Sequence, residues 1–187
     1  MSLARVVAEG YRGALPTLLV SAAGGLLAGR ILGGMNAELE AVRGLLVMVP
    51  AFLAIRGSVY GSLGSRLSTA LHQGLLEPAV RYDDRLASAV VAAVANGVTA
   101  SLFAAGLTAV LLPALGRPVA SPWTLASIAV VGGLLAGAAL SVSIVTVLFA
   151  GYRRGLNPDD LVGPAVTTAG DVFGMASLFL ATRLALA

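Results

Sequence analysis

Asp171 is the only acidic residue inside any of the long apolar stretches of this chain. The other carboxylates lie at the start of the chain or between those stretches: Glu9, Glu38, Glu40, Glu77, Asp83, Asp84, Asp159 and Asp160. A carboxylate at the depth of a lipid bilayer is costly unless it is paired, protonated or facing water. Asp171 is therefore a candidate for a functional site, and in its ionised form it favours a cation as its partner.

Two hydroxyl side chains share a predicted helical face with Asp171. Thr167 precedes it by four residues and Thr168 by three, and both spacings place side chains on one side of a helix. Hydroxyl, carboxylate and backbone carbonyl oxygens are hard ligands, which suit Mg²⁺, Ca²⁺ or Mn²⁺. Pro164 is expected in the first turn of this helix, where its missing N–H would be unpaired in any case. Asp171 then lies about 14 Å along the helix, close to the bilayer midplane.

A second polar stripe is predicted in the segment 56–66. Its serines and glycines recur at i, i+4 and i+7 on two neighbouring helical faces: Ser58, Ser62, Ser65, Gly57, Gly61 and Gly64. Ser58 is expected at nearly the depth of Asp171, so the two helices are predicted to meet and to line one polar path. Two structural alternatives stay open. The serines can bond their own backbone or a neighbouring helix, and Asp171 can form an ion pair with Arg56.

The composition places both stripes in a membrane protein. Of the 187 residues, 58% are hydrophobic and 11% are charged, whereas a soluble domain carries about 25% charged residues. Five apolar stretches are long enough to span a bilayer at about 20 residues per crossing: 13–35, 44–69, 86–114, 122–151 and 162–186. We therefore predict an all-α bundle of five transmembrane helices that forms a single domain, 1–187. With no cysteine and one histidine, disulfides, thiolate metal sites and two-histidine sites within one chain are excluded.

The arginines predict how the bundle is oriented in the cell membrane. With five spans, the N-terminus, the second connection and the fourth connection share one side, which collects Arg5, Arg12, Arg81, Arg85, Arg153 and Arg154. Fewer arginines lie near the other side: Arg43, Arg117 and Arg183. Since an excess of basic residues marks the cytoplasm, we predict a cytoplasmic N-terminus and an external C-terminus. The arginines are scattered singly between spans, which does not favour a nucleic-acid patch.

The hexapeptide Gly-Gly-Leu-Leu-Ala-Gly occurs twice, at 24–29 and 132–137. Each copy contains a GxxxG pair, Gly25 with Gly29 and Gly133 with Gly137, and this spacing allows helix backbones to approach closely. We predict helix packing at both copies, without inferring a duplication.

Two motifs resemble a known family. The segment Pro50 to Ser58, followed by Ser-Arg-Leu-Ser-Thr-Ala at 65–70, is similar to the Pro…Gly-Asn…Ser-Arg-Leu-Ser-Thr-Ala signature of the MgtE magnesium channels and their eukaryotic solute-carrier relatives. The segment 157–171 is similar to that family's Asp-Pro-Asp…Pro…Thr-Thr…Asp motif. The resemblance extends over essentially the whole chain, and the five predicted spans match the family's membrane domain in number and order.

The resemblance implies a homodimer of five-helix protomers with a central pore for Mg²⁺, held at the dimer axis by Asp171. A symmetric pair would contribute two carboxylates, which favour a divalent ion over a monovalent one. The predicted metal ligands are Asp171, Thr167, Thr168, Gly57 and Ser58, and the predicted pore lining adds Ser62, Ser65, Gly61 and Asn157. Two positions depart from the family pattern, since Ser58 replaces an Asn and Asn157 replaces an Asp.

The family's cytoplasmic sensor domains have no counterpart in this sequence, so we expect gating to work differently. Acidic residues on the predicted cytoplasmic side are candidates for a regulatory metal cluster, with plain solvation as the alternative: Asp159, Asp160, Asp83, Asp84 and Glu77. The preferred function is a channel or transporter for divalent cations, and a proton- or sodium-coupled transporter is a variant of it. The alternative is an accessory membrane subunit in which Asp171 pairs with Arg56. An enzyme is not expected, because the apolar stretches hold one carboxylate and lipid-phosphate chemistry needs several acidic or histidine side chains. No organic cofactor is expected either.

Overall fold

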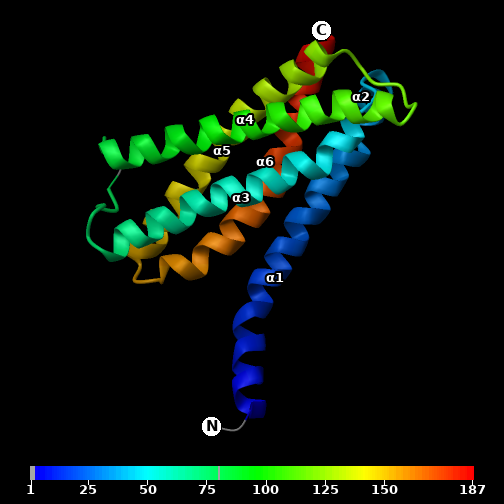
Figure 1. Cartoon of the computed structure of the whole chain (residues 1–187). Helices are drawn as coiled ribbons and strands as arrows, with labels where there is room; N and C mark the ends of the chain where they lie inside the picture. Colours follow the sequence, from blue (N-terminus) through cyan, green and yellow to red (C-terminus); the bar gives the residue numbers. More distant parts are fainter. Residues whose placement is uncertain (1–2, 80) are drawn as a thin grey trace.

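The computed structural model describes the backbone of residues 3–79 and 81–187, with the side chains of residues 11, 15, 16, 18–79 and 81–187. The side chains of Arg5 and Arg12, which the orientation prediction uses, lie outside this description. Six helices make up the described chain (Figure 1): α1 Leu3–Gly33, α2 Asn36–Ala41, α3 Leu45–His72, α4 Asp84–Ala114, α5 Pro122–Arg153 and α6 Pro158–Leu186.

The helices have the length and composition of membrane spans. Four of them, α3 to α6, are long and apolar enough to cross a bilayer, and α1 contains a shorter apolar segment, Leu18–Gly33. The predicted all-helical membrane bundle is confirmed at this level. The six-residue helix α2 was not predicted, because its sequence, Asn-Ala-Glu-Leu-Glu-Ala, is polar and short and resembles an ordinary connection.

The start of α6 corrects one prediction. The helix begins at Pro158, four residues before the predicted start at 162, and Pro164 lies inside it and not in its first turn. The capping residues explain the earlier start. The Asn157 side chain accepts a hydrogen bond from the Asp159 backbone N–H at 3.2 Å, and a proline is well tolerated at the first helical position. Asp171 now lies thirteen residues beyond Pro158, about 20 Å along the axis, which is still near the middle of the helix.

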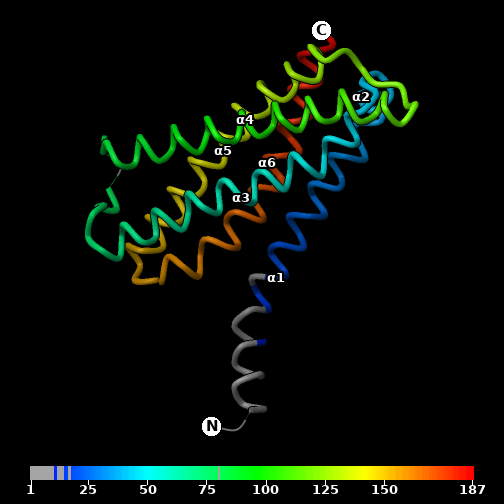
Figure 2. The backbone as a smooth tube through the Cα atoms, in the orientation of Figure 1, coloured from blue at the N-terminus to red at the C-terminus, as the bar shows by residue number. Residues whose placement is uncertain are grey.

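The two C-terminal helices form the centre of the bundle. Helix α5 packs against α3, α4 and α6, and α6 also packs against α1 and α3. In the backbone trace (Figure 2), α1 and α3 diverge from the end that holds α2, and the first half of α6 lies between them in this view. One apolar cluster lies toward α2 and includes Phe52, Leu125 and Leu178. A second cluster includes Tyr60, Leu140 and Ile144.

The predicted close packing of the GxxxG pair is confirmed in the second copy of the hexapeptide, Gly133 and Gly137, whereas in the first copy the close contact is made by Gly24 and not by the pair Gly25 and Gly29. An added Cβ would lie 2.8 Å from Thr168 Cγ2 at Gly24, 3.1 Å from Val98 Cγ2 at Gly133 and 2.6 Å from Tyr60 Oη at Gly137. At Gly29, by contrast, a Cβ would meet no atom of the described residues within 4 Å. Identical residues in the two copies therefore make different contacts, because the first copy packs on α6 and the second on α3 and α4.

Candidate functional site

Asp171 lies on the face of α6 between its contacts with α1 and with α3. On the α3 side, a Cβ at Gly174 would lie 2.9 Å from Leu53 Cδ2. On the α1 side, a Cβ at Gly25 would lie 3.9 Å from Asp171 Oδ2. The carboxylate is thus half-buried beside the bare backbone of α1, and we refer to Thr167, Thr168 and Asp171 as the polar face of α6.

The two threonines differ in how their hydroxyls are satisfied. Thr167 Oγ1 donates to the Gly163 carbonyl at 2.9 Å, a backbone bond common for threonine in helices. It also lies 3.1 Å from Ser21 Oγ of α1, so Ser21 is left to donate across the α1–α6 contact. Thr168 Oγ1 is buried and has no hydrogen-bond partner among the described residues. The predicted grouping of these threonines with Asp171 is therefore present, with Ser21 as an additional member.

The Asp171 carboxylate takes part in none of the side-chain hydrogen bonds or ion pairs found among the described residues. The ion pairs there join Glu77 to Arg81 at 3.1 Å and Glu38 to Arg183 at 3.5 Å. No group of three His, Asp or Glu side chains in the described part of the chain is arranged to hold a metal ion. One protomer thus offers a single carboxylate at this depth, and that carboxylate has no hydrogen-bond or ionic partner among the described residues.

Arg56 is fully buried, but it faces away from Asp171. Its guanidinium donates to Ser101 Oγ and, at 3.5 Å, to the Gly97 carbonyl, both on α4. It also stacks on the Phe52 ring, with 4.0 Å from Cζ to the ring centroid. The ion pair between Arg56 and Asp171 that the sequence left open is not formed, so the structure gives no support to the accessory-subunit interpretation.

Helices α3 and α6 meet as predicted, but not through the serine stripe. Their contact uses Gly64, where a Cβ would lie 2.7 Å from Val162 Cγ1, and a hydrogen bond from Ser68 Oγ to Asp159 Oδ1 at 2.5 Å. Ser58 and Ser62 instead line a groove between α3 and α4, and Ser65 is exposed. At Gly57 and Gly61, no atom of the described residues lies within 4 Å of an added Cβ. Leu53 and Gly64 occupy the side of α3 that contacts α6, whereas Ser58 and Ser62 lie on a different side of this helix.

Comparison with known proteins decides the family. Residues 49–181, which include both motifs described above, match the profile of MgtE, a divalent cation transporter. The chain belongs to the MgtE family. It is 27% identical over 173 residues to solute carrier family 41 member 3 of Rattus norvegicus, covering 89% of this chain and 37% of that protein. It is 28% identical over 138 residues to solute carrier family 41 member 2 of Xenopus laevis, covering 72% of this chain and 24% of that protein.

Membership of the MgtE family has two direct consequences. The chain is a transporter-family protein and not an enzyme, as predicted. It also spans only 24% to 37% of the length of these curated relatives, so properties of the complete relatives do not transfer to it automatically.

Three of the five acidic residues predicted for regulation in this MgtE-family chain make local side-chain contacts. Asp83 caps α4 and accepts from the backbone N–H groups of Arg85 at 2.9 Å and Leu86 at 3.0 Å. Glu77 pairs with Arg81, and Asp159 accepts from Ser68. Asp84 and Asp160 are exposed in the first turns of α4 and α6. These residues do not form a cluster within the described chain, so a shared metal there stays a prediction. The Ser68–Asp159 bond was not foreseen, because the two residues are 91 positions apart.

Proposed function

We propose that this chain transports divalent cations, with Mg²⁺ as the principal substrate, along the polar face of α6 in a homodimer. The observation that carries the proposal is the Asp171 carboxylate, which is half-buried in the middle of a membrane helix and has no ionic partner among the described residues. An ionised group in that position is costly without a counter-ion. Family membership makes a transported divalent cation the counter-ion of choice.

A second copy of the chain supplies what one protomer lacks. Two Asp171 side chains related by a two-fold axis carry two negative charges, which a divalent cation neutralises and a single Na⁺ does not. Mg²⁺ sheds its water reluctantly and is usually held by one or two carboxylates through a partly retained hydration shell. The half-exposed position of Asp171 leaves room for such a shell, and Thr167 and Thr168 place hydroxyl oxygens on the same face.

The glycines of α3 fit the role of a narrow route in this dimer. Gly57 and Gly61 present backbone without side chains, and the predicted ligand Ser58 follows Gly57 directly. With the N-terminus in the cytoplasm, the Asn157 end of α6 is the cytoplasmic entrance. Of the further predicted pore-lining residues, Ser65 is exposed on α3, where a second protomer is required to enclose a path, whereas Ser62 borders α4 and is not part of this route.

The test is cation flux into proteoliposomes, with Mg²⁺, Ca²⁺, Mn²⁺ and Na⁺ compared side by side. Asp171→Asn keeps the shape and removes the charge, and we expect Mg²⁺ flux to fall by at least about tenfold, as for the loss of groups that support a metal site. Glu40→Gln, which removes an exposed charge from α2, is the control and should change flux little. Undiminished Mg²⁺ flux in Asp171→Asn would remove this residue from the route. Flux that depends on a pH or Na⁺ gradient would favour the coupled transporter.

The dimer has a separate test, which benefits from the absence of cysteine in the sequence. A single Thr167→Cys change should yield a disulfide-linked dimer in membranes, whereas Leu134→Cys on the exposed side of α5 should not. A protein that transports Mg²⁺ while remaining monomeric in lipid would contradict the shared site.

A further inference from the structure

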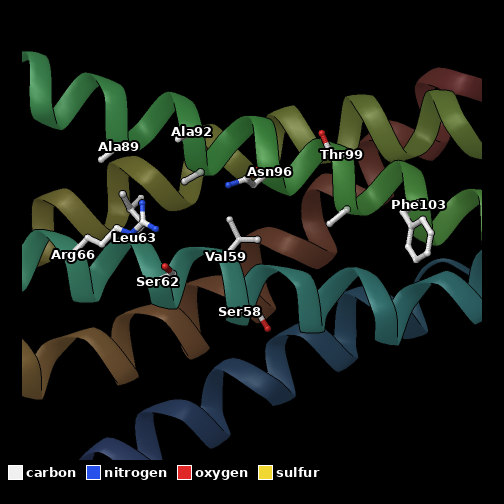
Figure 3. A pocket seen from close by; sticks show the side chains of 12 residues that line it. Ser58, Val59, Ser62, Leu63, Arg66, Ala89, Ala92, Asn96, Thr99 and Phe103 are labelled. Carbon is white, nitrogen blue, oxygen red and sulfur yellow. The ribbon is translucent and has the colours of Figure 1, made fainter.

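A lateral groove runs between α3 and α4, apart from the polar face of α6 (Figure 3). It has a volume of about 620 Å³ and is open to the side of the bundle. A second groove of about 460 Å³ shares Ala100 and Phe103 with it and continues toward the α2 end of α3. The two therefore form one continuous surface channel along the α3–α4 contact, which we call the lateral groove.

The lateral groove changes from polar to apolar along its length. Arg66 stands at one end, six residues before the end of α3, and is the charged side chain among the described residues that line the groove. Ser62, Asn96 and Thr99 follow, and Ile55 and Leu107 lie in the apolar part beyond Phe103. From Arg66 to Ala51, a lining residue of the apolar part, α3 rises about 22 Å. That distance is about one leaflet of a bilayer, counted from the headgroups to the midplane.

Three polar residues toward the Arg66 end of the groove, Arg66 itself, Asn96 and Thr99, have no side-chain partner among the described residues. Asn96 and Thr99 are exposed, and within the described chain neither side chain forms a hydrogen bond. An amide that faces hydrocarbon without a partner is costly. Arg66 is also exposed and belongs to neither ion pair found among the described residues. Figure 3 shows the nitrogen of Asn96 directed into the space between α3 and α4, with the Arg66 guanidinium in the same space. A ligand that satisfies these groups has an anionic head group at Arg66, hydrogen-bond acceptors near Asn96 and an apolar tail along the rest of the groove.

We propose that the lateral groove binds an anionic glycerophospholipid from the leaflet at the C-terminal end of α3, which is the predicted cytoplasmic one. The phosphate lies at Arg66, the ester oxygens accept from Asn96 and Ser62, and an acyl chain runs over Ala100 and Phe103. An anionic lipid is favoured because Arg66 brings a positive charge without a carboxylate, whereas a choline headgroup brings a cation of its own. The cytoplasmic leaflet is also where anionic lipids attract basic side chains. The polar-to-apolar order matches a lipid better than a second protomer, whose helix face would have to reproduce the same gradient.

Lipid binding is measured by native mass spectrometry of the purified full chain, titrated with dioleoylphosphatidylglycerol or dioleoylphosphatidylcholine. We expect the wild type to prefer the anionic lipid, and Arg66→Gln to lower binding of that lipid about fivefold, as one basic residue near a membrane surface warrants. Arg85→Gln is the matched control, because Arg85 is exposed at the same predicted membrane side but does not line the groove. It should leave the lipid preference unchanged.

Two further variants separate the groove from general surface charge. Ala92→Phe fills the groove without changing charge and should weaken binding of both lipids. Asn96→Leu removes the amide and should weaken both as well, while retaining the preference for the anionic lipid. Equal losses in Arg66→Gln and Arg85→Gln, or normal lipid binding in Ala92→Phe, would overturn the proposal. So would a crosslink between two chains from a single cysteine at position 92, because a second protomer would then occupy the groove.

Discussion

Gly137→Ala should destabilise the protein through one identifiable contact. Gly137 lies on α5 opposite Tyr60 of α3, and an added Cβ would stand 2.6 Å from Tyr60 Oη and 3.2 Å from Val94 Cγ2. A non-bonded contact of 2.6 Å to a Cβ atom is too short to persist, so one of the two atoms would have to shift. The Tyr60 ring is fully buried in the second apolar cluster, so it has no free space into which its hydroxyl can move.

The expected magnitude follows from two opposed effects. Inserting a methyl group into a well-packed core costs about 1–3 kcal/mol. Replacing glycine by alanine within a helix returns up to about 1 kcal/mol. A contact of 2.6 Å places the cost in the upper part of its range, about 2–3 kcal/mol. The net loss is then about 1–2 kcal/mol, which corresponds to a fall in melting temperature of about 2–8 °C for a chain of this size.

The assay is thermal unfolding of the detergent-solubilised protein, with Gly29→Ala as the control. Gly29 holds the same place in the repeated hexapeptide but meets no described atom within 4 Å, so its replacement should not lower the melting temperature. Tyr60→Phe removes the hydroxyl, which is buried without a hydrogen-bond partner among the described residues. It should restore most of the stability lost in Gly137→Ala. A variant that melts like the wild type, or that Tyr60→Phe fails to rescue, would refute the contact.

Two other stability predictions concern buried charge and capping. Arg56→Met should leave the melting temperature unchanged or raise it, because an apolar side chain of similar size often replaces a buried charge without loss of stability. Arg56→Ala should lower the free energy of unfolding by about 2–5 kcal/mol, because it leaves a cavity. Rescue of Arg56→Ala by adding Asp171→Ala would instead reveal an ion pair that the structure does not contain. Asp83→Ala should cost about 0.5–2 kcal/mol by removing the α4 cap, whereas Asp84→Ala, beside it, should change stability little; chemical unfolding of both variants compares the two.

The sequence predicts the helices well, because long apolar runs of limited charge have few structural alternatives. It also predicts that Thr167, Thr168 and Asp171 share a face, since their spacing fixes this once the segment is helical. The start of α6 was within reach, because Asn157, Pro158 and two acidic residues form a recognisable helix N-terminus. Placing Pro164 in the first turn instead puts the predicted start, residue 162, about one turn too late.

Contacts between helices were less predictable. The spacing of Ser58 and Ser62 identifies a stripe on α3, but periodicity does not say which neighbour the stripe faces. In the structure these serines border α4, and the contact with α6 uses Leu53 and Gly64. Matched depth also suggested that Arg56 and Asp171 could pair. Depth along a helix leaves rotation about its axis undetermined, and here the guanidinium points to α4.

The short bond between Ser68 and Asp159 joins the last turns of α3 to the first turn of α6, and the predicted regulatory metal would give the same carboxylate a second, competing task. A divalent ion that bound Asp159 would have to displace the Ser68 hydroxyl, and this would break the hydrogen bond between α3 and α6. Occupancy of the acidic end by metal and closure of the bundle at that end would then oppose each other, and the concentration of ions beside the membrane would set the balance between them.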